Sequence, residues 1–194
     1  MKKHFYIFRH GQTQWNVDGR AQGQSPYPIP LTQEGCEQAQ KLGEKLSGKN
    51  IGVIYSSDLH RAMQTAEIIG KILGVSVVED KRLREVNYGR LNGLYPLEMA
   101  EVYPNYRQCY EDFSCPFPDG ESLNQVVERF NQAIEEIVQK SPYEKVGIST
   151  HGHIIMAFLS SLFRGEDSHI NNGEYVHLMY DSDETVKKFT KLQN

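Results

Sequence analysis

The sequence predicts an α/β fold: a three-layer sandwich with a mainly parallel central sheet flanked by helices, plus a small cap insertion. Short apolar runs alternate with segments of helical periodicity, a pattern typical of parallel sheets. The 194 residues suffice for one core, so we expect a single domain over 1–194. Hydrophobic residues make up 39% and charged residues 24%, an ordinary globular balance.

Five apolar runs have the length of short strands. They lie at 5–8, 51–55, 75–78, 146–149 and 176–180. Because helical patterns separate most of them, we expect most neighbouring strands to be parallel.

The first two long helices have clear end signals. Thr32 is a candidate N-cap for the first helix, and the Ser-Gly pair at 47–48 ends it. The pattern at 59–73 predicts the second helix, with Gly74 as its C-terminal stop.

Two further helices are expected in the second half of the chain. Ser122 and Gln125 can form a capping box at the start of one, which stops before the Ser-Pro pair at 141–142. The apolar segment after His151 has helical length, and its first backbone amides would point toward the same crevice as that histidine. Positions 86–121 fit no single regular element, and we expect the cap insertion at about 88–121.

Two histidines follow predicted strands. The triplet Arg-His-Gly at 9–11 follows the first apolar run, and Thr-His-Gly at 150–152 follows the fourth. Ligands of open α/β sheets bind beyond the carboxyl ends of the strands, so these histidines can meet although 141 positions separate them. This geometry suits histidine chemistry on an anion.

Charge and composition exclude several classes of protein. The formal net charge is −4 and no basic run is present, which argues against a nucleic-acid partner. The N-terminal apolar run is too short for a signal segment or a membrane span. We therefore expect a cytoplasmic protein without a membrane partner, either a monomer or a homodimer.

The three cysteines predict neither a metal site nor a cysteine phosphatase. The chain has an odd number of cysteines, and none of them form the closely spaced pairs typical of metal sites: Cys36, Cys109 and Cys115. This pattern suits a reducing compartment. A cysteine phosphatase needs arginine six positions after its nucleophile, and these positions hold Leu42, Cys115 and Glu121. We interpret all three as small, partly buried side chains.

An ordered set of motifs resembles the histidine phosphatase (phosphoglycerate mutase-like) superfamily over most of the chain. The motifs are Arg9-His10-Gly11-Gln12-Thr13 with Asn16, Pro30 to Gly35, Ser57 to Ala66, Leu83-Arg84-Glu85 with Tyr88-Gly89, Gly120-Glu121-Ser122, and Thr150-His151-Gly152. The resemblance implies a metal-independent phosphatase that acts on a small phosphorylated metabolite and needs no cofactor.

The resemblance also assigns the catalytic residues. His10 is the expected nucleophile, forming a phosphohistidine while its other ring nitrogen donates to a backbone carbonyl. Arg9 and Arg61 would pair with phosphate oxygens, and His151 would complete the positive pocket. Glu85 resembles the family's general acid, which protonates the leaving oxygen and later deprotonates the attacking water.

Further residues are expected at the rim of the site. Asn16 is a candidate neutral donor, and Thr13, Gln22 and Gly152 are further substrate-binding candidates. The remaining histidines are interpreted as structural or surface residues: His4, His60, His153, His169 and His177.

The 88–117 stretch is rich in aromatic residues. They are Tyr88, Tyr95, Tyr103, Tyr106, Tyr110, Phe113 and Phe117. In the family, the segment after the acid often folds over the pocket, so a cap for an aryl or bulky alcohol is one hypothesis. A hydrophobic cluster beneath a long loop is an equal alternative. At Arg90 and Asn92 the chain departs from the family pattern, which leaves the substrate open.

Three other functions remain to be weighed. A phosphoglycerate mutase would share every residue above, but only 66 positions separate Glu85 from His151, too few for the longer mutase insertion. The Asp-Ser-Asp-Glu-Thr sequence at 181–185 matches the aspartate-nucleophile phosphatase motif, yet only nine residues follow it, so we interpret it as a surface turn. A non-catalytic phospho-ligand binding module is the third alternative.

Overall fold

A six-stranded sheet in the order β3-β2-β4-β1-β5-β6 forms the centre of the computed structural model, which describes residues 2–163, 168–181 and 188–192. The strands are β1 Lys2–Arg9, β2 Val53–Ser56, β3 Val77–Glu79, β4 Lys145–Thr150, β5 Tyr175–Asp181 and β6 Lys188–Leu192. The first four in this order pair in parallel, and β5 and β6 are antiparallel. The predicted mainly parallel sheet is confirmed.

The antiparallel direction of β5 follows from where its chain begins. Before β5, the amide of Gly173 donates to the carbonyl of Arg9, and the amide of Arg9 donates to Glu174. The chain thus enters β5 beside the last residue of β1, so the two strands must run in opposite directions.

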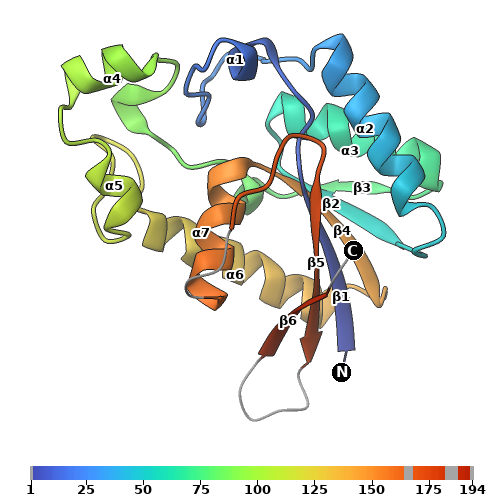
Figure 1. Cartoon of the computed structure of the whole chain (residues 1–194). Helices are drawn as coiled ribbons and strands as arrows, with labels where there is room; N and C mark the ends of the chain where they lie inside the picture. The colour runs from blue at the N-terminus through green and yellow to red at the C-terminus, as the bar shows by residue number, and fades with distance from the viewer. Residues whose placement is uncertain (1, 164–167, 182–187, 193–194) are drawn as a thin grey trace.

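Helices cover both faces of the sheet (Figure 1). The four long ones are α2 Gln33–Leu46, α3 His60–Leu73, α6 Leu123–Lys140 and α7 Gly152–Leu162. Buried residues of α2 and α3 pack with Tyr6, Phe8 and Ile54 on one face, and α6 and α7 pack with Phe5 and Ile7 on the other. This is the expected three-layer sandwich.

The predicted helix ends are confirmed. The Thr32 side chain accepts a hydrogen bond from the amide of Gly35 at the start of α2. Gly74 ends α3 in the left-handed conformation at φ +69°, and Ser122 and Gln125 form the capping box of α6.

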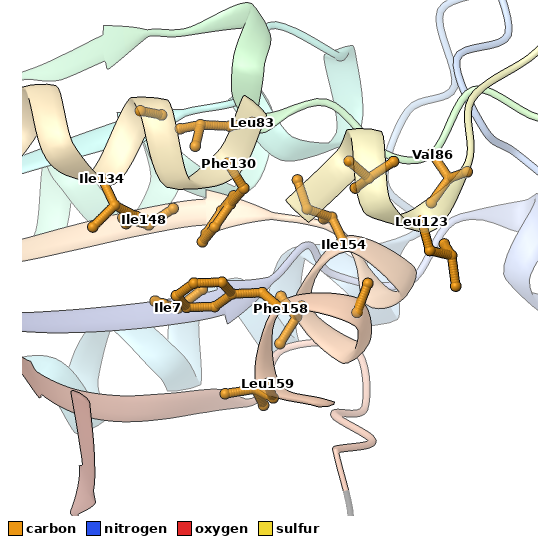
Figure 2. Packing of buried hydrophobic residues seen from close by; sticks show 14 of the residues in the cluster. Ile7, Leu83, Val86, Leu123, Phe130, Ile134, Ile148, Ile154, Phe158 and Leu159 are labelled. Atoms are coloured by element: carbon orange, nitrogen blue, oxygen red, sulfur yellow. The ribbon is translucent and has the colours of Figure 1, made fainter. Parts of the chain in front are cut away.

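The larger core lies between the sheet and the α6–α7 layer (Figure 2). Ile7 and Ile148 project from adjacent strands toward Phe130 of α6 and Phe158 of α7. The two phenyl rings lie 4.7 Å apart between centroids. This packing fixes α7, whose first turn reaches the carboxyl end of the sheet.

The 86–121 region contains only short elements and leads along one side of the sheet to α6 (Figure 1). These elements are η2 Gly89–Leu91, α4 Pro96–Val102 and α5 Gln108–Glu111. Two other short helices lie outside the region: η1 Lys81–Leu83 directly before it, and α1 Gln14–Val17 after β1. Most of its aromatic residues pack with the larger core, whereas Tyr95 is 40% exposed. A packed cluster therefore describes most of these side chains.

Of the 181–185 motif, only Asp181 lies within the described residues, at the end of β5. The interpretation of the motif as a surface turn concerns residues outside that range.

Among the helices of the described ranges, none combines the length and apolar character needed to cross a membrane.

Candidate active site

The pairing of β1 with β4 brings His10 and His151 together. Arg9 and Thr150 are in register at the ends of these strands, and the amide of His10 donates to the carbonyl of Thr150 at 3.0 Å. The imidazole centroids of the two histidines lie 5.2 Å apart. The predicted meeting of the two strand-end histidines is therefore observed.

Both ring nitrogens of the buried His10 are engaged. Nδ1 lies 2.7 Å from the carbonyl oxygen of Gly11, and Nε2 lies 3.3 Å from Nε of Arg61. Since a carbonyl and a guanidinium demand opposite roles, the proton belongs on Nδ1 and the lone pair on Nε2. Burial, followed by the charges of Arg61 and Arg9, holds the pKa of His10 well below 6.5, so the imidazole is neutral.

Two arginines bring positive charge into the interior. Arg61 is 2% exposed, and its Nη2 donates to the carbonyl of Gly23 at 2.8 Å. Burial lowers the pKa of Arg61 to about 10, which leaves the guanidinium charged at neutral pH. Arg9 donates from Nη1 to the carbonyl of Ile170 at 3.0 Å, whereas its buried Nε has no partner among the described residues.

His151 is completely buried. Its Nε2 lies 2.8 Å from the hydroxyl of Ser57, and its Nδ1 has no partner in the described part of the chain. Burial, then the charge of Arg61, keeps the pKa of His151 well below 6.5. The positive charge of the pocket therefore comes from the arginines, and His151 offers a neutral imidazole. An unpartnered buried nitrogen calls for a ligand, and this one is suited to an oxygen of an anion if it carries the proton.

Glu85 is held by the first turn of α7. Oε1 accepts from the amides of Val86 and Ile154, at 3.0 and 3.1 Å, and Oε2 accepts from the amide of His153 at 3.2 Å. The backbone carbonyl of Glu85 accepts a hydrogen bond from the guanidinium of Arg129 in α6 at 3.0 Å. The amides expected to point toward an anion at this helix end thus donate to Glu85 instead.

The four rim candidates occupy different positions. Asn16 and Gln22 line the cavity beside His10, whereas Thr13 is fully buried, with its hydroxyl 3.0 Å from the side-chain oxygens of both. Thr13 therefore touches the rim residues rather than the cavity. A Cβ on Gly152 would lie 3.2 Å from the Arg9 guanidinium, so this glycine leaves room for Arg9.

Most of the candidate site residues line a cavity of about 100 Å³. Its lining residues are Arg9, His10, Asn16, Arg20, Ala21, Gln22, Gly23, Arg61, Glu85, Tyr88, Tyr110 and His153. His151, whose ring neighbours that of His10, is not in this lining.

Sequence reasoning missed several residues of the site. His153, interpreted as structural or surface, is partly exposed, and its ring also lines the cavity, with its Nδ1 2.6 Å from the hydroxyl of Tyr88. Its place two residues after His151, in the first turn of a predicted helix, was an available signal. The partners of Ser57 and Arg129 could not be anticipated, because they depend on contacts between distant elements.

Fold and site together define an α/β protein with a histidine nucleophile candidate and two guanidinium groups, one of them fully buried, at the carboxyl end of its sheet. Such a site is suited to phosphoryl transfer. The sequence model of the histidine phosphatase superfamily (branch 1) matches residues 5–191, and the chain belongs to this superfamily.

Similar proteins include both phosphatases and a probable mutase. The probable phosphoglycerate mutase GpmB of Citrobacter koseri is 35% identical over 159 residues, which cover 81% of this chain and 73% of the relative. A mycobacterial glucosyl-3-phosphoglycerate phosphatase, solved with VO3, has a TM-score of 0.86 at 29% identity, over 97% of this chain and 96% of the other. YhfR of Bacillus stearothermophilus has a TM-score of 0.83 at 26% identity, over 97% and 96% of the two chains.

Proposed function

We propose that the protein hydrolyses small phosphate monoesters, without a metal, through a phosphohistidine on His10. The observation that carries the proposal is the pairing of His10 between the carbonyl of Gly11 and the guanidinium of Arg61. This pairing holds the imidazole neutral with its lone pair on Nε2, the form that can attack phosphorus. The unpartnered Nε of Arg9 and Nδ1 of His151 support an anion beside that nitrogen.

The proposed reaction has two steps. Nε2 of His10 attacks phosphorus, the ester bond breaks, and protonated Glu85 gives its proton to the leaving oxygen. A water molecule then attacks the phosphohistidine and loses a proton to Glu85, which releases inorganic phosphate and restores His10. Arg9 and Arg61 stabilise the charge that spreads over the phosphoryl oxygens in each transition state.

Mutase activity is the main alternative, and the name of the C. koseri relative favours it. A mutase returns the phosphoryl group to a substrate and must keep water out. The 88–121 segment contributes only Tyr88 and Tyr110 to the cavity lining, and no lysine or arginine from it lies there to bind a glycerate carboxylate. We therefore favour transfer to water. We also place the reaction in the cytoplasm, which suits three free thiols.

The test is a phosphate-release assay in the presence of a chelator. A panel of phosphate monoesters that includes 2- and 3-phosphoglycerate is given to the wild type and to His10→Ala. The control variant His60→Ala makes the same change on an exposed histidine of α3. Rapid quenching with a phosphorus-32 ester, followed by peptide mapping, measures labelling of His10.

We expect phosphate release from several esters, labelling of His10, full activity in His60→Ala and none in His10→Ala. Interconversion of the two glycerates without net phosphate release would establish a mutase instead. Binding of phosphate without turnover of any ester would favour a phospho-ligand binding module. Loss of activity to the chelator would contradict a metal-independent mechanism.

A further inference from the structure

A second, larger cavity adjoins the phosphate-sized one. It has a volume of about 360 Å³, within the range of cavities that hold organic ligands. The two cavities share Arg9, Glu85, Tyr110 and His153. A group esterified to a phosphate beside His10 can therefore extend past Glu85 into the larger cavity.

One wall of the larger cavity is built of flat and apolar side chains, and the rest of the lining includes Arg9, Glu85 and His169. The rings of Tyr110 and His153 lie 4.9 Å apart between centroids, and Met156 of α7 adds a thioether. The hydroxyl of Tyr88 holds His153 by its Nδ1 at 2.6 Å, and Tyr88 packs in turn against Phe117, with 4.9 Å between their ring centroids. Aromatic rings and thioethers stabilise other rings packed against them.

The charge of this wall is also informative. Burial lowers the pKa of His153 and raises that of Tyr110, so both side chains are neutral near pH 7. Among the described residues that line this cavity, Arg9 is the only lysine or arginine, and it is needed for the phosphate; His169 also lines it. A negatively charged group on the alcohol would face Glu85, with no lysine or arginine of the lining left to pair with it.

From this cavity we infer the substrate class: phosphate monoesters of uncharged alcohols that carry a ring. The inference rests on the proposed hydrolysis at His10 and adds that the wall of Tyr110, His153 and Met156 binds the ring of the leaving alcohol. The inferred substrate class is wider than the aryl-alcohol hypothesis, because it also includes alcohols with a non-aromatic ring. It excludes ring alcohols that carry a carboxylate.

The test compares kcat/KM for esters of primary alcohols, whose chemistry at phosphorus is the same. The series is ethyl phosphate, benzyl phosphate, 4-carboxybenzyl phosphate and the methyl ester of the last. We expect the kcat/KM of benzyl phosphate to exceed that of ethyl phosphate about tenfold or more, since ring packing and apolar burial both favour the benzyl group. The carboxybenzyl ester should fall about tenfold below its uncharged methyl ester.

A charged variant tests the location of the binding surface. Met156→Lys adds a cation to the wall and should raise the ratio of carboxybenzyl to benzyl kcat/KM about tenfold. The control Val78→Lys adds the same charge at an exposed position on β3 and should leave that ratio unchanged.

Each outcome decides one point. Equal kcat/KM for ethyl and benzyl phosphate, or for the carboxybenzyl ester and its methyl ester, would overturn the inference while the proposed hydrolysis stands. An unchanged ratio in folded Met156→Lys would overturn the location, and if that variant does not fold, the ester series alone decides. Absence of hydrolysis of every ester, with no label on His10, would instead refute the proposed function.

Discussion

At the scale of single residues, burial decides the chemical state of the ionisable groups. His10 and His151 are neutral because they lie inside the protein beside two guanidinium groups. Arg61 stays charged although it is almost fully buried, because its charge is compensated by a hydrogen bond to the carbonyl of Gly23 and by nearby Glu85. The site therefore combines neutral imidazoles with fixed cations before any phosphate arrives.

Burial also predicts an unreactive thiol at Cys109. Its Sγ lies 3.0 Å from that of Cys115, and burial raises the pKa of Cys109 to about 12. Because the thiolate is the reactive form, alkylation of Cys109 by iodoacetamide at about pH 8 should be at least about a hundredfold slower in the folded protein than in urea. Peptide mapping by mass spectrometry at a series of times measures the rate, and equal rates in the two states would refute the expected protection.

Motifs predict some residues of the candidate site better than others. The position of His10 and His151 at strand ends predicts their place in the site, and the family resemblance adds Arg9, Arg61 and Glu85. The structure brings these five residues together. Their catalytic roles stay predictions. The motif that begins at Ser57 does not reveal its contact with His151, and no motif marks Arg129, because the partner of each side chain lies far away in the sequence.

At the scale of elements, the start of α7 couples the candidate acid to the fold. Its first amides hold the carboxylate of Glu85, while His151 directly precedes the helix. A shift of this helix would therefore move the acid and the second histidine together.

The acid role of Glu85 predicts a dependence on the leaving group. In Glu85→Gln, kcat for benzyl phosphate should fall about a hundredfold or more, because an alkoxide needs a proton to leave. For 4-nitrophenyl phosphate, whose phenolate leaves unprotonated, the decrease should stay within about tenfold. Steady-state kinetics on both esters measure the difference, with Glu79→Gln on β3 as an exposed control. Equal decreases for the two esters would remove Glu85 from this role.

A close approach of two backbones positions the loop after β1. A Cβ on Gly11 would lie 2.3 Å from the carbonyl oxygen of Gly35 in α2, far inside the van der Waals contact distance of carbon and oxygen. We expect Gly11→Ala to reduce the free energy of unfolding by about 2–4 kcal/mol. Gly19→Ala, at φ +71° with open space around it, should cost only about 1 kcal/mol. Urea unfolding measures both values, and similar losses would show that the contact relaxes freely.

Elements with strong local signals could be predicted, and the others could not. The ends of α2, α3 and α6 follow from capping residues and a stop glycine that act within one turn. The direction of β5 depends on where the preceding loop returns, and the 86–121 region folds around core contacts without a repeating pattern. Hydrophobic periodicity does not encode either of these features.

At the scale of the whole molecule, the buried imidazoles predict acid sensitivity. The pKa values of His10 and His151 lie well below 6.5 in the folded protein, and that of His177 is lowered to about 4. Below about pH 6.5 the unfolded chain binds protons that the folded chain does not, so the free energy of unfolding decreases as the pH falls toward about 4. Each such histidine contributes up to about 1.4 kcal/mol per pH unit.

This sensitivity can be measured by urea unfolding at about pH 7 and about pH 5. The midpoint should be lower at the acidic pH, and His10→Gln should lessen the difference because it removes one of the buried imidazoles. Identical midpoints at the two pH values would mean that these histidines are protonated in the folded protein as readily as in the unfolded chain.

The central place of β1 in the sheet governs when the protein can form during its synthesis. β1 is made first, yet both of its neighbours, β4 and β5, come from the last third of the chain. A nascent chain that ends before residue 145 offers β1 neither of these partners, and long-range pairing of this kind makes folding slow. The pairing that brings His10 and His151 together therefore cannot form until synthesis has passed β4.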